Sequence, residues 1–246
     1  MITDTSKTVR ELALEVPNAT RVFEKLGIDY CCGGNKPLWE ACAASNLPVD
    51  EVLRSLEASA AAPQSASPAD WQERHLTQLI DHIVEKHHTY VKQELPRLQQ
   101  LLAKVASVHG RNHPEIQGIE STFAGLFEEL TAHLTKEERI LFPYIKVMEE
   151  AFLHGQKPPH PMFGTVKHPV EMMTMEHDSA GDALKKIRQT SSNFTPPPDA
   201  CITYKTLYQA FAEFEADLHQ HIHLENNILF PRAVEMEMHV PAAGRP

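Results

Sequence analysis

The stretch ELTAHLTKEERILFP, residues 129–143, returns later in the chain as DLHQHIHLENNILFP, residues 217–231. Each copy has an acid, a histidine four residues later, a glutamate four residues after that, and then the run Ile-Leu-Phe-Pro. Residues four apart lie on one face of an α-helix, with Cβ atoms about 6 Å apart. In each copy the histidine and the glutamate can therefore reach one metal cluster. The two pairs are His133 with Glu137 and His221 with Glu225.

The segments around these copies predict an all-α fold. From residue 71 onward no stretch alternates with the period of a β-strand, and apolar residues recur with helical spacing. Short connections between long helices predict antiparallel neighbours, so residues 71–240 should form an up-down-up-down four-helix bundle. We expect prolines 96, 143 and 231 to kink or end their helices. The four predicted helices cover about 71–108, 115–152, 168–193 and 199–236.

The repeat extends to the partner helices. His88 lies 45 residues before His133, and His177 lies 44 residues before His221. Each half is therefore a helical hairpin, with one histidine on its first helix and the His-x3-Glu pair on its second. Facing bundle helices commonly hold such metal sites. The six predicted ligands are His88, His133, Glu137, His177, His221 and Glu225.

The remaining histidines of the bundle are less suitable as ligands. At 1.5 Å per residue, His109 lies about 30 Å along the helix axes from the predicted cluster, so it belongs to the hairpin turn. His219 and His223 lie about 200° around the helix from the ligand between them, and His168 is on the face opposite the ligand of its own helix. His87 is the hardest to exclude, because a shift of register by one residue would exchange it with its neighbour.

The donor set predicts a pair of iron ions. If both glutamates bridge, each ion receives two carboxylate oxygens and two imidazole nitrogens, and an oxo or hydroxo bridge leaves one position open on an octahedral ion. These ligands suit non-haem iron, although manganese accepts the same types. A single His-x3-Glu pair is usually a surface ion pair, but its duplication with matched partner histidines favours the di-metal site. We expect the acids Glu129 and Asp217 to accept hydrogen bonds from the far ring nitrogens of His133 and His221.

The N-terminal part predicts a small helical domain, residues 1–58, joined by a flexible Ala/Ser/Pro-rich linker, residues 59–70. Its turn Cys31-Cys32-Gly33-Gly34 allows two interpretations. The cysteines could be small residues packed in a glycine turn, or an exposed thiol pair for redox chemistry or iron relay, with pKa values lowered by nearby backbone N–H groups. Cys42 and Cys201 are assigned to packing.

Composition limits the kinds of partner. The formal net charge of −10 argues against nucleic acid and against an anionic membrane surface. No apolar run approaches the roughly 20 residues of a membrane helix, and we see no secretory signal. We therefore expect a cytoplasmic protein with no nucleic-acid or membrane partner, and a homodimer is compatible with the sequence.

The bundle, about 71–236, resembles the hemerythrin-like domain. It departs from oxygen-carrying hemerythrins at the third helix, where they have His-x3-His and this chain has Gly181 four residues after His177. The whole chain resembles the repair-of-iron-centres (RIC) family. The motifs that carry the resemblance are Asp29–Gly34, Glu176–Asp178, Thr195–Pro198 and Leu224–Pro231.

The RIC resemblance implies a di-iron protein, induced by nitric oxide or peroxide, that helps to restore damaged iron–sulfur clusters. It implies iron donation to iron–sulfur proteins or their scaffold, nitric oxide binding at the di-iron site, and an electron donor. Such a protein is a repair factor rather than a turnover enzyme. The alternatives are a nitric oxide reductase and a sensor or scavenger of nitric oxide or oxygen.

Overall fold

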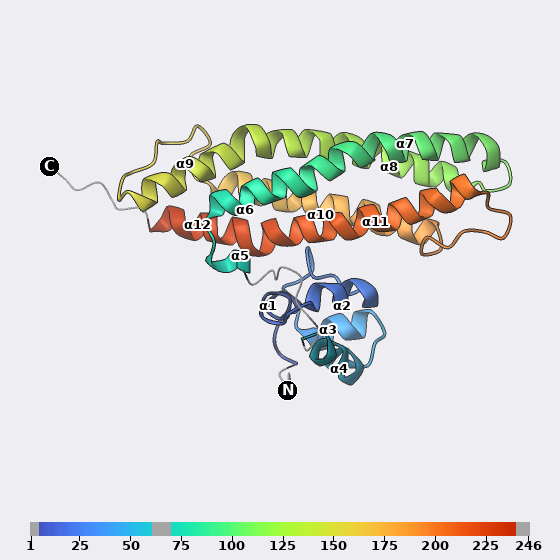
Figure 1. Cartoon of the computed structure of the whole chain (residues 1–246), viewed down its shortest axis with the longest axis horizontal. Helices are drawn as coiled ribbons and strands as arrows, with labels where there is room; N and C mark the ends of the chain where they lie inside the picture. The colour runs from blue at the N-terminus through green and yellow to red at the C-terminus, as the bar shows by residue number, and fades with distance from the viewer. Residues whose placement is uncertain (1–4, 61–69, 240–246) are drawn as a thin grey trace.

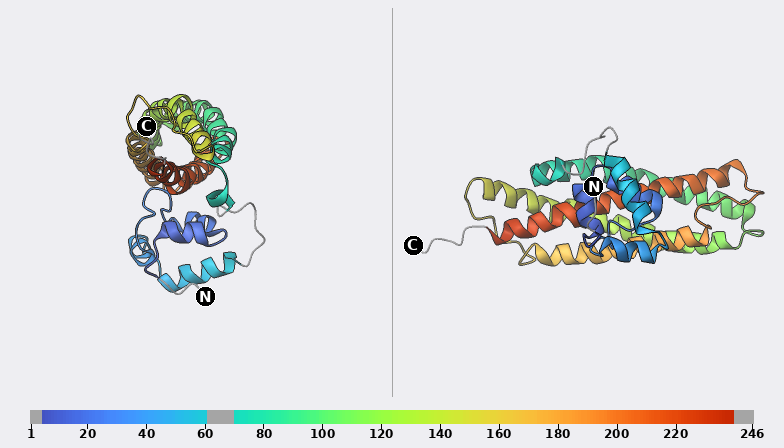
Figure 2. Two further views of the ribbon diagram at one scale, coloured as in Figure 1. Left: turned by 90° about the vertical axis from the view of Figure 1, so that its left-hand side faces the viewer. Right: turned by 90° about the horizontal axis from the view of Figure 1, so that it is seen from below.

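The computed structural model describes residues 5–60 and 70–239, and it confirms the predicted all-α fold. Within those residues the backbone forms helices and turns and no β-strand. A long helical bundle carries a smaller N-terminal helical unit on one side (Figures 1 and 2). None of the described helices has both the length and the apolar character needed to cross a membrane.

Four helical arms run side by side around a common axis, as the end-on view shows (Figure 2). Three of them contain a short π-helical segment, labelled η, and the third in sequence is a continuous α-helix. Their ends lie within a few residues of the predicted helices, apart from a late start of the first arm. The arms are α6 (Leu76–His82), η1 (Ile83–His88) and α7 (Thr89–His109); α8 (Glu115–Lys136), η2 (Glu137–Leu141) and α9 (Phe142–Leu153); α10 (Lys167–Thr190); and α11 (Ile202–Leu224), η3 (Glu225–Leu229) and α12 (Phe230–Met238).

The prolines do not end these arms. Pro96 lies inside α7, which continues for thirteen residues beyond it to His109. Pro143 and Pro231 each follow a π-helical turn, in which the N–H of the preceding phenylalanine donates to a carbonyl five residues back. Proline cannot supply the N–H of the next helical bond. The wider π-helical turn accommodates the missing hydrogen bond. The turn begins at Glu137 in one copy of the repeat and at Glu225 in the other.

The N-terminal unit packs four short helices around its own apolar core, which includes Phe23, Leu38 and Leu56. A capping box begins the first helix: Thr8 accepts from the backbone N–H of Glu11, whose carboxylate accepts from the N–H of Thr8. The helices are α1 (Val9–Glu15), α2 (Ala19–Leu26), α3 (Leu38–Ala44) and α4 (Val49–Ala60).

The predicted linker, residues 59–70, falls mostly on residues 61–69, which lie outside the described residues. Residues 59 and 60 belong to α4, and residue 70 begins the single turn α5 (Asp70–Glu73). The proposed boundaries 1–58 and 71–240 stay predictions.

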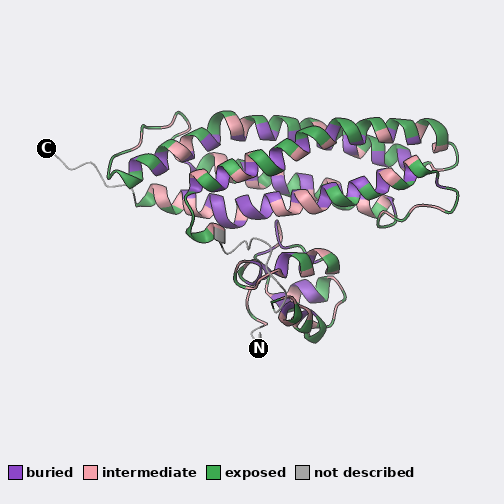
Figure 3. Cartoon of the chain, viewed as in Figure 1, coloured by how far each residue is buried: buried purple, intermediate pink, exposed green. Residues whose placement is uncertain are grey.

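Two apolar layers make up the bundle core, and the predicted metal ligands lie between them. Leu134 belongs to one layer and Leu141 to the other, with Glu137 between them on the second arm. On the fourth arm Ile222 and Ile228 bracket Glu225 in the same way. Buried residues accordingly follow the inner faces of the arms (Figure 3). Each fully buried Leu or Ile contributes about 1.5–3 kcal/mol, so the ligand layer is held by strong packing on both sides.

Candidate metal centre

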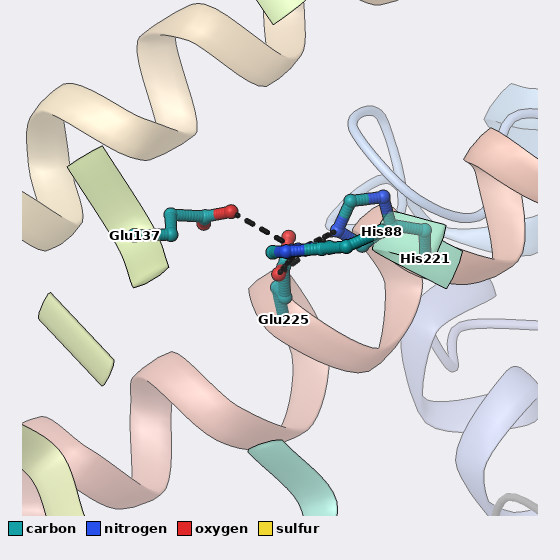
Figure 4. A group of neighbouring side chains, drawn as sticks. All are labelled: His88, Glu137, His221 and Glu225. Atoms are coloured by element: carbon teal, nitrogen blue, oxygen red, sulfur yellow. Dashed lines mark hydrogen bonds and ion pairs between the residues drawn. The ribbon is translucent and has the colours of Figure 1, made fainter. Parts of the chain in front are cut away.

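The six side chains predicted as ligands converge in the middle of the bundle. All of them are buried, with at most 2% of any residue exposed. They form two groups of four, and each group contains two histidines and the same two glutamates. One group is His88, Glu137, His221 and Glu225 (Figure 4); the other is His133, Glu137, His177 and Glu225.

Each group takes one histidine from each half of the repeat. In the first group the Nε2 atoms of His88 and His221 are 3.1 Å apart. In the second group the Nε2 atoms of His133 and His177 are 3.0 Å apart. The inward-facing nitrogens thus gather at two neighbouring points, which is the arrangement that a pair of ions needs.

The two glutamates lie between these points. Glu137 Oε2 is 3.4 Å from His88 Nε2 and 3.3 Å from His133 Nε2, so it faces both groups. Glu225 directs one oxygen to each group, with Oε1 3.0 Å from His221 Nε2 and Oε2 3.1 Å from His177 Nε2. This geometry suits carboxylates that bridge two cations.

The two buried glutamates give the cluster a negative charge that favours positive charge beside them. Burial and the nearby Glu225 oppose ionisation of Glu137, but the facing imidazoles of His133 and His88 still lower its pKa to about 2. Burial disfavours the charged form of His88, yet Glu137 and Glu225 outweigh it and raise the pKa of that histidine to about 10. The same competition raises the pKa of His133 to about 9. Two buried carboxylates therefore hold positive charge beside them.

Unpartnered buried atoms also fit a metal site. Among the described residues neither carboxylate oxygen of Glu137 receives a hydrogen bond, although the residue is fully buried, and Glu225 Oε2 also receives none. A buried carboxylate without donors costs several kcal/mol unless a cation compensates it. Carboxylate oxygens and imidazole nitrogens without a thiolate suit iron or manganese among the common metals. The chain thus has a buried site for metal.

Three of the four candidate ligand histidines are oriented by groups that were not predicted from the sequence. His88 Nδ1 lies 2.8 Å from Glu138 Oε1, and Lys92 holds the same carboxylate at 2.6 and 2.7 Å. A carboxylate on the far nitrogen fixes the tautomer, so that Nε2 is left for the metal.

The third and fourth helical arms supply the corresponding groups for His133 and His177. His133 Nδ1 lies 2.8 Å from Glu176 Oε2, and Lys136 pairs with the other oxygen of that carboxylate. His177 Nδ1 lies 2.8 Å from Asn226 Oδ1. Each orienting residue is next in sequence to a ligand, because a neighbour turned by 100° on its helix faces the adjacent helix.

The predicted roles of Glu129 and Asp217 are wrong. Glu129 accepts from Ser179 Oγ at 3.0 Å, and Asp217 Oδ1 lies 3.0 Å from Nδ1 of His87 rather than beside His221. Nδ1 of His221 has no partner among the described residues. The acid one turn before a ligand lies along the same helix, whereas the far ring nitrogen points across to a neighbouring arm.

His87 is buried beside the cluster but outside both metal groups. Its ring stacks on that of His221, with centroids 5.7 Å apart and planes within 10°. Its exclusion as a ligand is therefore consistent with the packing.

The histidines that face away from the cluster hold the N-terminal unit. His219 Nδ1 lies 2.9 Å from Glu24, and the ring of His223 packs edge-on against Tyr30 with centroids 5.5 Å apart. Asn227 Nδ2 donates to the carbonyl of Tyr30 at 3.0 Å, and Arg10 donates to the carbonyl of Asn227. The fourth arm thus carries candidate metal ligands on one face and contacts the N-terminal unit with another.

These contacts place the cysteine turn next to the metal centre. Cys32 Sγ lies 3.6 Å from the main-chain oxygen of His177, and Cys31 packs into the bundle core at 5% exposure. Asp29 Oδ1 accepts from the N–H groups of both cysteines. The prediction of an exposed pair is wrong for Cys31, which is buried. The contact with Cys32 and burial raise the pKa of its thiol well above the usual range, opposite to the expected lowering. The two sulfurs are 3.8 Å apart and form no disulfide.

The packing assignment of the other cysteines is right for one of them. Cys42 is buried in the N-terminal core, whereas Cys201 is exposed at the N-terminus of α11.

Comparison with known proteins supports the resemblance seen in the sequence. Residues 79–233 match the family described as the hemerythrin HHE cation binding domain, and residues 5–60 match a domain of unknown function, DUF542. The iron-sulfur cluster repair protein YtfE of Yersinia pseudotuberculosis is 37% identical over 232 residues, which are 94% of this chain and 98% of that protein. The protein of the same name from Escherichia coli O81 is 40% identical over 227 residues, 92% of this chain and 96% of that one.

Proposed function

The chain belongs to the hemerythrin HHE cation binding family, and on that premise we propose that it repairs iron–sulfur clusters by donating iron. The two repair proteins compared above share almost their whole length with it, which supports the same role here. The observation that carries the proposal is the pair of four-residue groups that share Glu137 and Glu225. Four protein donors for each ion are fewer than an octahedral ion accepts.

The proposed ligands are His88, His133, Glu137, His177, His221 and Glu225, with two iron ions as the cargo. Bound there, iron would have open positions for nitric oxide and would be exchangeable. The protein's own part is to hold the six side chains in position and to shield them from water. Glu138, Glu176 and Asn226 keep the Nε2 atoms of three histidines directed inward.

Delivery of iron needs an opening, because the ligand side chains are closed off from solvent. Two features make the edge of the site suitable for one. Both shared glutamates begin π-helical turns, which are less regular than α-helix. The cysteine turn lies against α10 beside His177, and we propose that Cys32, the more accessible thiol, binds iron there as it leaves the site.

The test is a paired measurement on the full chain. Iron-loaded protein is mixed with a nitric-oxide-damaged [4Fe–4S] enzyme and a reductant, and the iron left in the protein and the activity of the enzyme are both followed. Iron donation predicts that the protein loses iron in proportion to the recovered enzyme. If the enzyme recovers its activity while the protein keeps all of its iron, iron donation is contradicted.

Nitric oxide reduction is the second candidate, because the same open positions could bind that gas. It predicts many turnovers to nitrous oxide per chain, with an electron donor and without loss of iron. Gas chromatography of the headspace in the same experiment separates the two functions. A protein that neither turns over nitric oxide nor loses iron would contradict both.

A further inference from the structure

A second group of potential metal ligands lies at the end of the bundle opposite α12 (Figure 1). It combines His109, the last residue of α7, with His113 in the following turn and Asp199 in the turn before α11. Cys201, the residue that precedes α11, lies beside them. The 21 residues of α7 separate this group from the bundle site by about 30 Å.

The distances in this group suit a small ion. His109 Nε2 is 3.2 Å from Cys201 Sγ, and His113 Nε2 is 3.1 Å from each carboxylate oxygen of Asp199. The nitrogen and oxygen atoms of the two histidines and Asp199 all lie within 4.8 Å of one another. Donors around a tetrahedral zinc ion are about 3.3–3.8 Å apart, given bonds of about 2.0–2.3 Å.

The neighbouring residues hold the two rings in place. The N–H of His113 donates to the carbonyl of His109 at 2.9 Å, which continues the helical turn and keeps both rings on one side. Glu115 Oε1 lies 2.9 Å from His113 Nδ1 and so leaves Nε2 directed at Asp199. Tyr204, fully buried, packs its ring against both histidines, with centroids 5.3 and 5.6 Å away. A carboxylate behind a histidine is typical of zinc sites.

Cys201 can become the fourth ligand. Its Sγ contacts His109 Nε2 at 3.2 Å but lies outside the three-residue group, so its side chain would turn toward the bound ion. Cys201 is exposed, so an ion can reach it from solvent. Zinc binds the thiolate form of cysteine, so the ion would displace the proton of this thiol.

We propose that His109, His113, Asp199 and Cys201 bind one zinc ion, separate from the iron pair of the bundle. Two imidazoles, one carboxylate and one thiolate complete a tetrahedron, so the ion has no open position and its role is structural. It would join the α7–α8 turn to the α10–α11 turn.

The experiment uses Co²⁺ as a probe of the full, iron-loaded chain. One added equivalent should give intense visible bands of four-coordinate cobalt and a near-ultraviolet thiolate-to-cobalt band. The six ligands proposed for the bundle site contain no sulfur, so cobalt there would give no such band. Titration of Zn²⁺ against a chromophoric chelator then measures the affinity, and added Zn²⁺ should remove the cobalt bands.

Variants assign the site. In Cys201→Ser the thiolate band should disappear, and in Cys201→Ser and His113→Ala zinc affinity should fall at least 100-fold. Glu115→Gln should lose about tenfold, since it only orients His113. The controls are Cys32→Ser, the other accessible thiol, and His160→Ala, an exposed histidine of another loop; both should keep the band. A thiolate band that survives in Cys201→Ser, or no zinc bound beyond the bundle site in the unaltered chain, overturns the proposal.

Discussion

Cys32 Sγ lies 3.6 Å from the main-chain oxygen of His177, so the cysteine turn contacts the helix that carries a proposed iron ligand. The contact is with the backbone, whereas the ring nitrogens of His177 face Asn226 and His133. The sulfur is therefore beside the metal centre without being one of its ligands. We therefore expect the two thiols to have a role different from that of the metal ligands, and variants can test this expectation.

We expect Cys32→Ser to keep two irons per chain and the spectrum of the iron centre, while cluster repair falls at least tenfold. Cys31→Ser should disturb the bundle core, because that sulfur is buried. In the unaltered protein an alkylating reagent should modify Cys32 long before Cys31, as mass spectrometry of timed samples would show. Equal rates at the two sulfurs would contradict the described packing, and full repair activity in Cys32→Ser would remove the thiol from the mechanism.

Gly181 on α10 faces the sulfur of Cys32. A Cβ atom at position 181 would lie 3.5 Å from Cys32 Sγ, an ordinary van der Waals distance. Gly181→Ala should therefore be tolerated, and because alanine favours helix it should stabilise α10 by up to about 1 kcal/mol. Gly181→Leu should instead push the cysteine turn off the bundle and speed alkylation of Cys32 severalfold. Urea unfolding and alkylation rates measure the two effects, and a Leu variant with an unchanged rate would show that the turn does not rest on this glycine.

Much of this architecture could be predicted from the sequence because the information is local. The His-x3-Glu spacing in two copies places four ligands by helical geometry alone, and the equal spacing to His88 and His177 brings the other two level with them. The orienting residues were harder to predict. Glu138 and Glu176 contact histidines on other arms, and these contacts depend on how the helices are rotated against each other.

The docking of the N-terminal unit could not be predicted for the same reason. His219 and His223 were only expected to face away from the cluster, and no pattern in the sequence names Glu24 or Tyr30 as their partners. The burial of Cys31 follows from that docking. Cys201 and His109 are 92 residues apart and meet only because two turns end at the same place.

The shared glutamates should matter more for metal binding than any single histidine. His221→Ala combined with Glu225→Ala should abolish stoichiometric iron, because Glu225 belongs to both groups of four. His88→Ala alone removes a ligand from one group and should leave about one iron per chain. His168→Ala is the matched control, since this histidine on α10 is exposed and its Nδ1 bonds the carbonyl of Phe163. Iron is measured by plasma mass spectrometry, and a double variant with two irons would refute the ligand assignment.

The orienting carboxylates should have a graded effect. Glu138→Gln and Glu176→Gln keep the size of the side chains but weaken the hold on His88 and His133, so iron affinity should fall about 10–100-fold. Glu129→Gln, a carboxylate that bonds Ser179 instead, should leave the affinity unchanged. Competition with a ferrous chelator gives the three values. If Glu129→Gln weakened binding as much as Glu176→Gln, the charge of the surroundings rather than histidine orientation would be the cause.

Removal of metal should destabilise the whole bundle. Without metal, the buried carboxylates of Glu137 and Glu225 depend on the protonated imidazoles of His88 and His133 for positive charge, whereas two metal ions would compensate them more fully. A ligand present at 100 times its dissociation constant stabilises the folded state by about 2.7 kcal/mol. For a chain of this size that corresponds to a rise in Tm of roughly 5–10 °C. Scanning calorimetry with and without a chelator measures the shift, and the His221→Ala, Glu225→Ala double variant should melt at one temperature in both conditions. A shift of the same size in that variant would mean that the stabilising ion binds elsewhere, and then His113→Ala would tell whether the ion sits at the far end of the bundle.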